Sequence, residues 1–549
     1  MQAVSPVPWC SGQSWWILVP PTSVRIREGL PALTDPMCRG FVMSEVPRGI
    51  DLPPVHRRPP RPSASIMITR DGQKGLEVLL CRRVDELPAF PGFWAFPGGG
   101  RSRVDAEAVD RLPQLAEHGP DLGAALASMM RELVEEIGLN AEGHRLRAVD
   151  PSHRARVLAD RRGWLELVLE GSLRCDPSGI RLLGRRTTPP FGPMRFENTF
   201  LHLHLEHDSA FVPMLDQQTE FDDHTWATLR EVLEAWRSHR FKVPPPIVSI
   251  LSWIDLGMSD GAEFDDAVRS LASIDQDRIR IRFAHGVEVL PIPTATLPPA
   301  DHTNAYLIGP EDGEQILIDP AVRSEAAMSI VRSAVRRTER AGGTLIGIMY
   351  THRHADHLGD PKLLSELGVP VFGSEGTAEV THIDRILSDG VILELRGPTT
   401  RHEWKVLETP GHCPGHLCLM SPAGLIAGDM VAGVGTILIP PESGDMLVYL
   451  TQLERLRALE PHLIFPSHGP LVATPDRLLD RYLRHRRARH DRVRVAVDQA
   501  SDPVRIAALA YADSPDAHPG LALDQTYAHL LALEKEGIVR SDGARWFTA

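Results

Sequence analysis

The pattern of apolar and polar residues along the chain predicts three regions that contain strands and helices. In the first region, the apolar runs Ser65–Arg70 and Leu76–Arg82 predict two strands. Asp71 and Gly72 between them predict a tight turn. A helix is expected over Leu122–Ile137, because the next residue is a glycine of the kind that ends helices.

The pattern continues with further strands and a helix. Phe196–Glu206 alternates between apolar and polar residues, as a strand with one buried face does. Gln315–Ile318 and Leu345–Tyr350 predict two short strands, and Ser324–Ala341 between them predicts a helix. These elements indicate a second unit of mixed α/β structure.

The last region is predicted to be mostly helical. It begins with an arginine-rich helix from Asp476 to about Val497, followed by helical patterns around Val504–Tyr511 and Asp524–Glu536. Ile538–Phe547 has a central Asp-Gly turn and predicts a small hairpin.

These patterns predict an α/β multidomain protein. Residues 1–60 are rich in proline and tryptophan without periodicity and predict a disordered or loosely ordered lead. Met43 is therefore an alternative to Met1 as the true start. The further segments are a domain over 61–258, a polar connector over 259–285, a second domain over 286–475 and a small domain over 476–549.

Composition narrows the class of protein. The chain has 549 residues and a net charge of −13, which argues against a protein that coats nucleic acid over its whole surface. The six cysteines show no repeated C-x-x-C spacing, which fits a reducing compartment. No apolar run approaches the ~18 residues of a membrane span, and no signal peptide is recognisable. We therefore expect a cytoplasmic protein without a membrane partner.

Residues 351–360 hold the densest group of metal-ligand types in the sequence. His352, His354, Asp356 and His357 lie within six positions, directly after the expected strand Leu345–Tyr350. A strand end followed by a tight loop would aim these side chains at one point. Imidazole nitrogens and carboxylate oxygens are ligands that zinc accepts. The segment therefore predicts a metal-centred hydrolase.

Four more ligand-type residues lie at the ends of apolar runs, beside glycine or proline. These are Asp319, His412, Asp429 and His468. Loops that leave rigid strands at such points can hold ligand geometry closely. His402, His416 and His462 are interpreted as surface residues or as supports of neighbouring ligands.

With these motifs in this order, residues 286–470 resemble the metallo-β-lactamase superfamily. The resemblance implies an αββα sandwich that binds two zinc ions. One zinc would be held by His352, His354 and His412, the other by Asp356, His357 and His468, and Asp429 would bridge them. Asp319 would support the ligands. Cys413, where glyoxalase-like members usually carry Thr, would alter the surroundings of a ligand or act as a redox-sensitive thiol.

The expected zinc pair defines the chemistry of this domain. Two dications lower the pKa of a bound water from about 15.7 to near neutrality and polarise a carbonyl or phosphoryl oxygen. Asp356 would orient the attacking water as well as bind metal, which makes it the predicted catalytic residue. A thioester or related carbonyl ester is the expected substrate.

The last region resembles the winged-helix tail of the β-lactamase-like protein 2 group. Members of that group include glyoxalase II-like hydrolases and a single-strand-specific endoribonuclease. The helix carries arginines at 477, 481, 484, 486, 487, 489, 492 and 494. Such a cluster would contact RNA phosphates, or it would form a solvated or packed helix face. Both interpretations stay open.

A second dense signal is a group of carboxylates near the end of the helix Leu122–Ile137. Glu132, Glu135 and Glu136 are spaced i, i+3 and i+4, which puts them on one face of a helix. Their oxygens suit Mg²⁺ or Mn²⁺. Such an ion would bridge to the phosphates of a substrate.

Together with Arg131, these residues resemble the second half of the Nudix box, whose family fold is an α/β/α sandwich. The resemblance implies hydrolysis of a diphosphate, with Mg²⁺ or Mn²⁺ on Glu132, Glu135 and Glu136. Glu132 would be catalytic and Arg131 would support it. Gly123 stands where the box usually has another Glu, and the chain before Arg131 is about eighteen residues longer than the box. Coenzyme A diphosphatase-like members carry a comparable insertion.

We therefore predict a metal-dependent hydrolase with two active domains. The dinuclear zinc site would cleave a thioester or related carbonyl ester, and the Nudix-like domain would hydrolyse a CoA- or nucleotide-type diphosphate. The alternative is a zinc-dependent endoribonuclease whose winged helix holds RNA and whose Nudix half is a non-catalytic sensor or scaffold. The partners are then small-molecule substrates in the first case and RNA in the second.

Overall fold

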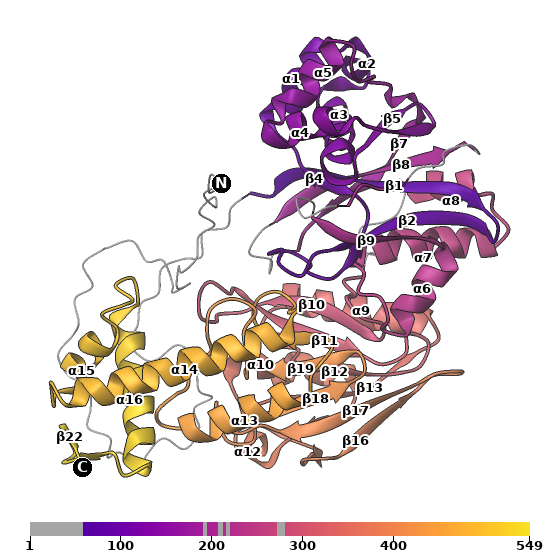
Figure 1. Ribbon diagram of the computed structural model, residues 1–549. Coiled ribbons are helices and arrows are strands. Elements are labelled where there is room, and N and C mark those ends of the chain that lie inside the picture. Colours follow the sequence, from indigo (N-terminus) through magenta and orange to yellow (C-terminus); the bar gives the residue numbers. More distant parts are fainter. Residues whose placement is uncertain (1–58, 190–194, 207–211, 216–219, 272–279) are drawn as a thin grey trace. The chain divides into compact units, whose positions relative to one another are not determined.

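The computed structural model describes residues 59–549 except 190–194, 207–211, 216–219 and 272–279 (Figure 1). Almost all of the lead predicted over 1–60 lies outside the described residues. The chain divides into two compact units, one ending at Val289 and the other comprising Leu290–Ala549. Both units mix strands and helices, which confirms the predicted α/β multidomain class.

The first unit is built on a seven-stranded sheet with the order β3-β2-β1-β8-β7, in which β4 pairs with β1 and β9 with β2. Its strands are β1 (Arg61–Gly72), β2 (Gly75–Arg83), β3 (Trp94–Ala95), β4 (Gly98–Gly100), β7 (Ile180–Thr187), β8 (Phe196–Leu205) and β9 (Phe221–Thr228). The three strands predicted in this unit are thus confirmed. The turn after β1 falls at residues 73–74, because Asp71 and Gly72 still pair with β2.

Helices cover both faces of this sheet. The helices are α1 (Arg103–Arg111), α2 (Pro113–Ala116), α3 (Gly119–Ile137), α4 (Pro151–Ala159), α5 (Arg162–Leu169), α6 (Leu229–Arg237), α7 (Pro245–Ser259) and α8 (Phe264–Ser270), and a ribbon of β5 (Leu139–Glu142) and β6 (Arg145–Ala148) follows α3. Successive side chains of a strand point to opposite faces. Accordingly, Ile66 and Ile68 pack with α3 and α5, whereas Met67 packs with α6, α7 and α8. The sheet therefore lies between two helical layers. Helix α8 lies within 259–285, the predicted connector, and buries Ala267.

Helix α3 carries the predicted carboxylates and ends where the sequence indicates. It starts three residues before the predicted Leu122 and ends at Ile137. Gly138 then adopts a φ of 66°, in the left-handed region that residues with a Cβ rarely adopt. Its amide donates to the Val134 carbonyl and so satisfies one of the last carbonyls of the helix.

The second unit contains a six-stranded and a five-stranded sheet. The first has the order β10 (Val287–Pro293), β11 (His302–Ile308), β12 (Glu314–Ile318), β13 (Thr344–Met349), β14 (Val371–Gly373) and β15 (Arg385–Ile386). The second has the order β16 (Ile392–Arg396), β17 (Arg401–Glu408), β18 (Leu417–Ser421), β19 (Gly424–Gly428) and β20 (Ile464–Pro466). Both strands predicted here, now β12 and β13, are confirmed.

The two sheets pack face to face and helices cover their outer faces. The rings of Tyr306 on β11 and Phe465 on β20 lie 5.8 Å apart, and the Tyr306 hydroxyl donates to the Pro466 carbonyl at 2.6 Å. Leu317 packs outward against α9 (Glu325–Arg340), which confirms the helix predicted over Ser324–Ala341. Leu425 packs outward with α13 (Met446–Ala458). Short helices α10 (Ala355–Leu358), α11 (Pro361–Leu364) and α12 (Glu375–Ala378) complete the predicted αββα sandwich.

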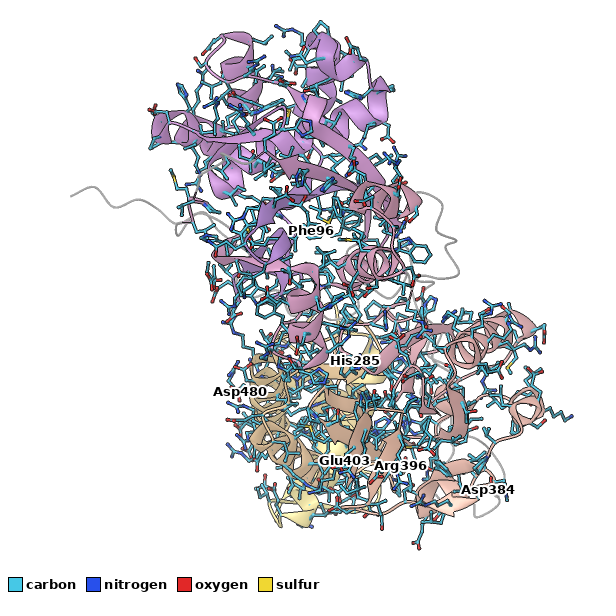
Figure 2. All side chains as sticks on the ribbon, turned by 90° about the vertical axis from the view of Figure 1, so that its right-hand side faces the viewer. Phe96, His285, Asp384, Arg396, Glu403 and Asp480 are labelled. Carbon is cyan, nitrogen blue, oxygen red and sulfur yellow. The ribbon has the colours of Figure 1, made fainter. Side chains whose placement is uncertain are left out.

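The hairpin of β16 and β17 shows the alternation of a half-buried sheet. Trp404 is buried, whereas its neighbour Glu403 forms an ion pair with Arg401. Arg401 also contacts Glu394 at 3.3 Å, and Glu394 pairs with Arg396 (Figure 2, which labels Arg396 and Glu403). The exposed charges of this hairpin therefore neutralise one another.

The chain ends in three helices and a β-hairpin. They are α14 (Pro475–Val497), α15 (Pro503–Ala510), α16 (Pro519–Lys535), β21 (Val539–Ser541) and β22 (Trp546–Thr548). The predicted helices and hairpin are thus confirmed as elements. Two of the clustered arginines, Arg486 and Arg489, are buried inside this helical part. Within the described part of the chain, no helix combines the length and apolar character needed to cross a membrane.

Candidate functional site

The densest ligand segment follows β13, as the sequence predicts. β13 ends at Met349, and the chain then turns through Thr351 into the single helical turn α10. His352, His354, Asp356 and His357 are all buried there. The strand thus delivers four potential ligands to one place.

The remaining predicted ligands come from the ends of other strands. Asp319 follows β12, Asp429 follows β19 and His468 follows β20, while His412 lies between β17 and β18. All four side chains are buried. Asp319 has a φ of 45°, an uncommon backbone conformation that carboxylate residues tolerate better than most.

Asp429 lies at the centre of this group. Its Oδ2 is 3.5 Å from His357 Nε2, 3.8 Å from His412 Nε2 and 4.0 Å from His352 Nε2. Its Oδ1 is 3.6 Å from His468 Nε2. One carboxylate therefore faces four imidazoles, as the residue between two metal ions would.

Potential ligand atoms within 4.8 Å of one another form three groups among the described residues. The groups are His352, His354 and His412; Asp356, His357 and His468; and Asp319, His352 and His357. The structure thus brings together both predicted ligand sets. It does not bring Glu132, Glu135 and Glu136 into such a group.

Hydrogen bonds to one ring nitrogen orient several of the histidines. His357 Nδ1 lies 2.9 Å from Asp319 Oδ2, and Asp319 also accepts from the Thr351 amide at 2.7 Å. His412 Nδ1 donates to the Leu438 carbonyl at 2.8 Å, and His468 Nδ1 to the His302 carbonyl at 3.1 Å. Such partners fix the ring and turn the other nitrogen toward the centre.

The chemistry of these atoms fits a bound cation. The Nε2 atoms of His352 and His357 are buried and make no hydrogen bond with any residue the structure describes. Buried polar atoms are normally satisfied, and coordination to a metal would satisfy these. Nitrogen and carboxylate ligands in sets of three are those that zinc accepts.

Burial and neighbouring charges set the protonation of the group. Burial lowers the pKa of His352 and His412 well below the usual value and that of His354 to about 4, so these rings stay neutral. Burial also opposes a charge on His357, but Asp429, Asp356 and Asp319 together raise its pKa. Although burial favours the neutral form of Asp356, His357 and His468 hold its pKa at about 2.

His416 supports the central carboxylate. Its ring is fully buried, and its Nε2 accepts a hydrogen bond from the Asp429 amide at 3.0 Å. Its other ring nitrogen lies 2.8 Å from the Thr409 hydroxyl. Cys413 is also fully buried, which keeps its thiol away from bulk solvent.

The carboxylates of α3 surround a fully buried arginine. Arg131 Nη1 donates to Glu132 and to Glu135, both at 2.8 Å. Glu136 is turned away and accepts from the Gly98 amide at 3.1 Å. A Cβ at Gly99 would lie 2.3 Å from the Glu132 carboxyl carbon, so a side chain there would displace this carboxylate.

Asp105 supplies a carboxylate that the sequence analysis missed. Its two oxygens accept from Arg131 Nε at 2.8 Å and from Nη2 at 2.9 Å, and both side chains are fully buried. Gly123, where a Glu was expected, is itself buried and approaches the Leu115 carbonyl too closely for a Cβ. The available signal was Ser102, which forms a capping box with Asp105 at the start of α1.

Burial raises the pKa of Glu132 and of Glu136. Burial raises the pKa of Glu132 to about 7, with Glu135 adding to the shift and Arg131 opposing it. Burial, Glu132 and Glu220 raise that of Glu136 further. A divalent cation here would have to displace protons.

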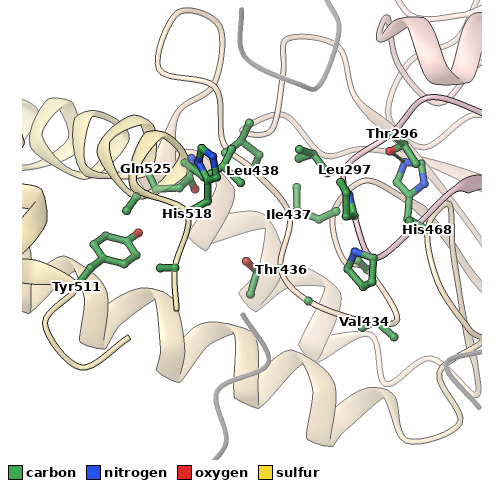
Figure 3. A pocket seen from close by; sticks show the side chains of 18 residues that line it. Thr296, Leu297, Val434, Thr436, Ile437, Leu438, His468, Tyr511, His518 and Gln525 are labelled. Carbon is green, nitrogen blue, oxygen red and sulfur yellow. Dashed lines mark hydrogen bonds between the residues drawn. The ribbon is translucent and has the colours of Figure 1, made fainter. Parts of the chain in front are cut away.

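A pocket of about 100 Å³ opens beside His468 (Figure 3). In Figure 3, Thr296 and His468 lie at one side of it and Tyr511 and Gln525 at the other. Most of its lining is apolar. The lining comes from residues 296–300, 432–438 and 517–525, with His468 and Tyr511. The pocket therefore lies between His468 and the C-terminal helices.

Comparisons with known proteins agree with this geometry. The family model described as "Metallo-beta-lactamase superfamily" matches residues 298–468, so the C-terminal part of the chain contains a metallo-β-lactamase superfamily domain. "Beta-lactamase-like protein 2 homolog" from Caenorhabditis elegans is 27% identical over 254 residues, which cover 44% of this chain and 81% of that protein. "Atrochrysone carboxyl ACP thioesterase AgnL7" from Paecilomyces divaricatus is 28% identical over 231 residues, covering 41% and 68%.

Part of the chain is also similar to a second kind of solved structure. It is the crystal structure of a NUDIX hydrolase from Alicyclobacillus acidocaldarius, 28% identical, covering 37% of this chain and 96% of that one. The TM-score of this match is 0.32.

Replacement of Asp105 tests the buried arginine network. We expect Asp105→Asn to lower the free energy of local unfolding around α1 and α3 by about 3 kcal/mol, because it leaves a buried guanidinium without one of its countercharges. Hydrogen exchange of peptides from both helices in the full chain measures this change.

Asp110→Asn is the matched control, since Asp110 lies on the same helix and is exposed. Exchange in α3 that is equally slow in both variants would contradict the importance of the Asp105–Arg131 pair.

Proposed function

We propose that the second unit is a metal-dependent hydrolase of thioesters or related carbonyl esters. The observation that carries this proposal is the convergence of both ligand sets on Asp429. A zinc pair would be held by His352, His354 and His412 on one side and by Asp356, His357 and His468 on the other, with Asp429 between them.

The zinc pair, when bound, would acidify a water and polarise the scissile carbonyl. The protein's own groups prepare this reaction. Asp356 is buried next to His468, and His357 and His468 favour its charged form, so it would orient the attacking water as well as bind metal. Asp319 and His416 hold His357 and the Asp429 backbone in place.

The apolar pocket supports an acyl group as the bound part of the substrate. Leu297, Val434 and Ile437 line it beside His468, and an anionic phosphodiester would find few partners there. The printed name of AgnL7, a thioesterase, supports the same class of substrate. The apolar lining is the argument against RNA cleavage. The arginine cluster does not decide it, because Arg486 and Arg489 are buried while the other six arginines are exposed.

A second function is proposed for the first unit, hydrolysis of a CoA- or nucleotide-type diphosphate. It is supported by the network in which Arg131 holds Glu132 and Glu135 behind the Gly98–Gly100 strand. Mg²⁺ or Mn²⁺ would bind Glu132, Glu135 and Glu136, and Glu132 would act as the base. A thioesterase joined to a CoA-cleaving domain would act on one molecule at two bonds.

The two proposed activities are separable by point variants. We expect Asp356→Ala to lower kcat/KM for CoA thioesters and hydroxyacyl-glutathione by about 10³-fold, because it removes a proposed metal ligand and the group that orients the water. Glu135→Gln should leave these activities unchanged and abolish Mg²⁺-dependent diphosphate hydrolysis. Both variants are assayed against one panel of thioesters, nucleoside diphosphate derivatives and short RNAs. Each variant serves as the control for the activity that the other is expected to lose.

Two results would contradict the proposal for the second unit. One is thioester hydrolysis that persists in Asp356→Ala. The other is cleavage of RNA with no thioester hydrolysis by the wild type, which would restore the endoribonuclease alternative.

The size of the pocket predicts a preference for acyl length. Ala522 and Leu521 both line it from α16. Ala522→Leu should narrow the pocket and lower kcat/KM for long acyl thioesters at least 10-fold relative to acetyl, as expected when packing forbids a few methylenes. Leu521→Ala should shift the preference in the opposite direction. A series of CoA thioesters of increasing acyl length measures both, and equal profiles for the two variants would show that the acyl group binds elsewhere.

A further inference from the structure

The loop Ile437–Ile439 connects the candidate metal site to the C-terminal helices. On its inner side, the Leu438 carbonyl accepts the hydrogen bond from His412 Nδ1 at 2.8 Å. Since a carbonyl can only accept, Nδ1 of His412 must carry the hydrogen. The neutral ring therefore offers the lone pair of Nε2 to the centre.

On its outer side, the same loop is held by two buried polar side chains. Arg486 of α14 donates to the Ile437 carbonyl. Gln525 of α16 donates to the Ile439 carbonyl at 3.0 Å and accepts from the Ile439 amide at 3.3 Å. Both neighbours of Leu438 are thus fixed by the C-terminal helices.

Arg486 and Gln525 also hold each other. Arg486 Nη1 donates to Gln525 Oε1 at 2.9 Å, and the two residues are only 2% and 6% exposed. Both Nη atoms of Arg486 and both amide atoms of Gln525 are paired, so the loss of either side chain leaves buried polar groups without partners. Packing alone would not need a guanidinium here, because an apolar side chain would fill the space at lower cost.

Helix α14 makes a further hydrogen bond to the chain around the site. The Tyr482 hydroxyl accepts from the Ala432 amide at 2.9 Å, in the loop that follows Asp429. Helix α14 therefore contacts the chain next to Asp429 as well as the loop that faces His412. Both contacts fall in the single connection between β19 and α13, so the C-terminal helices hold this connection at two places.

We propose that Arg486 and Gln525 are positioning residues of the metal centre. They fix the Leu438 carbonyl, which in turn fixes the orientation and the tautomer of His412. The C-terminal helices then form the outer part of the metal site as well as a wall of the pocket. This inference rests on the proposed function, in that it takes His412 to be a metal ligand.

Zinc release from the full-length protein tests the inference. In Arg486→Met and Gln525→Leu, one of two bound zinc ions should transfer to a chromophoric chelator about 10–100-fold faster than in the wild type, the usual cost of losing an outer partner of a ligand. Arg487→Met is the matched control, since Arg487 is the next residue of α14 but is 57% exposed and pairs with Glu454. It should release zinc at the wild-type rate. The absorption spectrum of the cobalt-substituted protein should change in the two buried variants only.

Gln525→Glu tests the same inference if the other two variants do not fold. It retains acceptors for Ile439 and Arg486 but loses the donor to the Ile439 carbonyl, so it should show a smaller acceleration. Folded variants that release zinc at the wild-type rate, with an unchanged cobalt spectrum, would overturn the inference. So would a Gln525→Glu protein that behaves as wild type when the other two variants are unfolded. A wild-type protein that binds no zinc would overturn the proposed function itself, which is a different result.

Discussion

The second unit depends on how it balances buried charge. Asp319, Asp356 and Asp429 lie within one group of buried imidazoles, and burying carboxylates is costly unless cations or hydrogen bonds compensate them. A charged His357 compensates part of this negative charge, and metal ions at the proposed site would compensate the rest. The surrounding structure keeps the compensating groups in place. Strand ends carry the ligands, and backbone carbonyls fix the orientation of the imidazole rings.

The sequence could indicate which residues come together here, because metal-ligand residue types stand out locally in the chain. Histidines and aspartates at the ends of apolar runs are unusual, and the αββα scaffold places those ends together. The Leu438 and His302 carbonyls could not be predicted in the same way. Their contribution comes from the backbone, so the identity of the residue gives no signal, and only the fold shows which carbonyl reaches His412 or His468.

The arginine-rich helix shows a different limit of sequence analysis. A cluster of cations suggests a surface for phosphates, because isolated buried arginines are rare. In α14, however, Arg486 and Arg489 are three residues apart and face inward, where backbone carbonyls and Asp513 receive their hydrogens. Arg487 between them faces outward and pairs with Glu454. Helical periodicity distinguishes the inward-facing arginines from the outward-facing Arg487. It does not identify their partners, which lie in distant segments of the chain.

The pairing of Asp105 with Arg131 bears on how buried arginine–carboxylate pairs are recognised from sequence. Their side chains meet in space although they are 26 residues apart, because α1 and α2 fold back onto α3. A carboxylate and a guanidinium can therefore keep one geometry while the segment between them changes length. Searches that demand a fixed interval between the two halves of such a motif would overlook chains of this kind. Searches for the buried pair itself, in structures, would recover them.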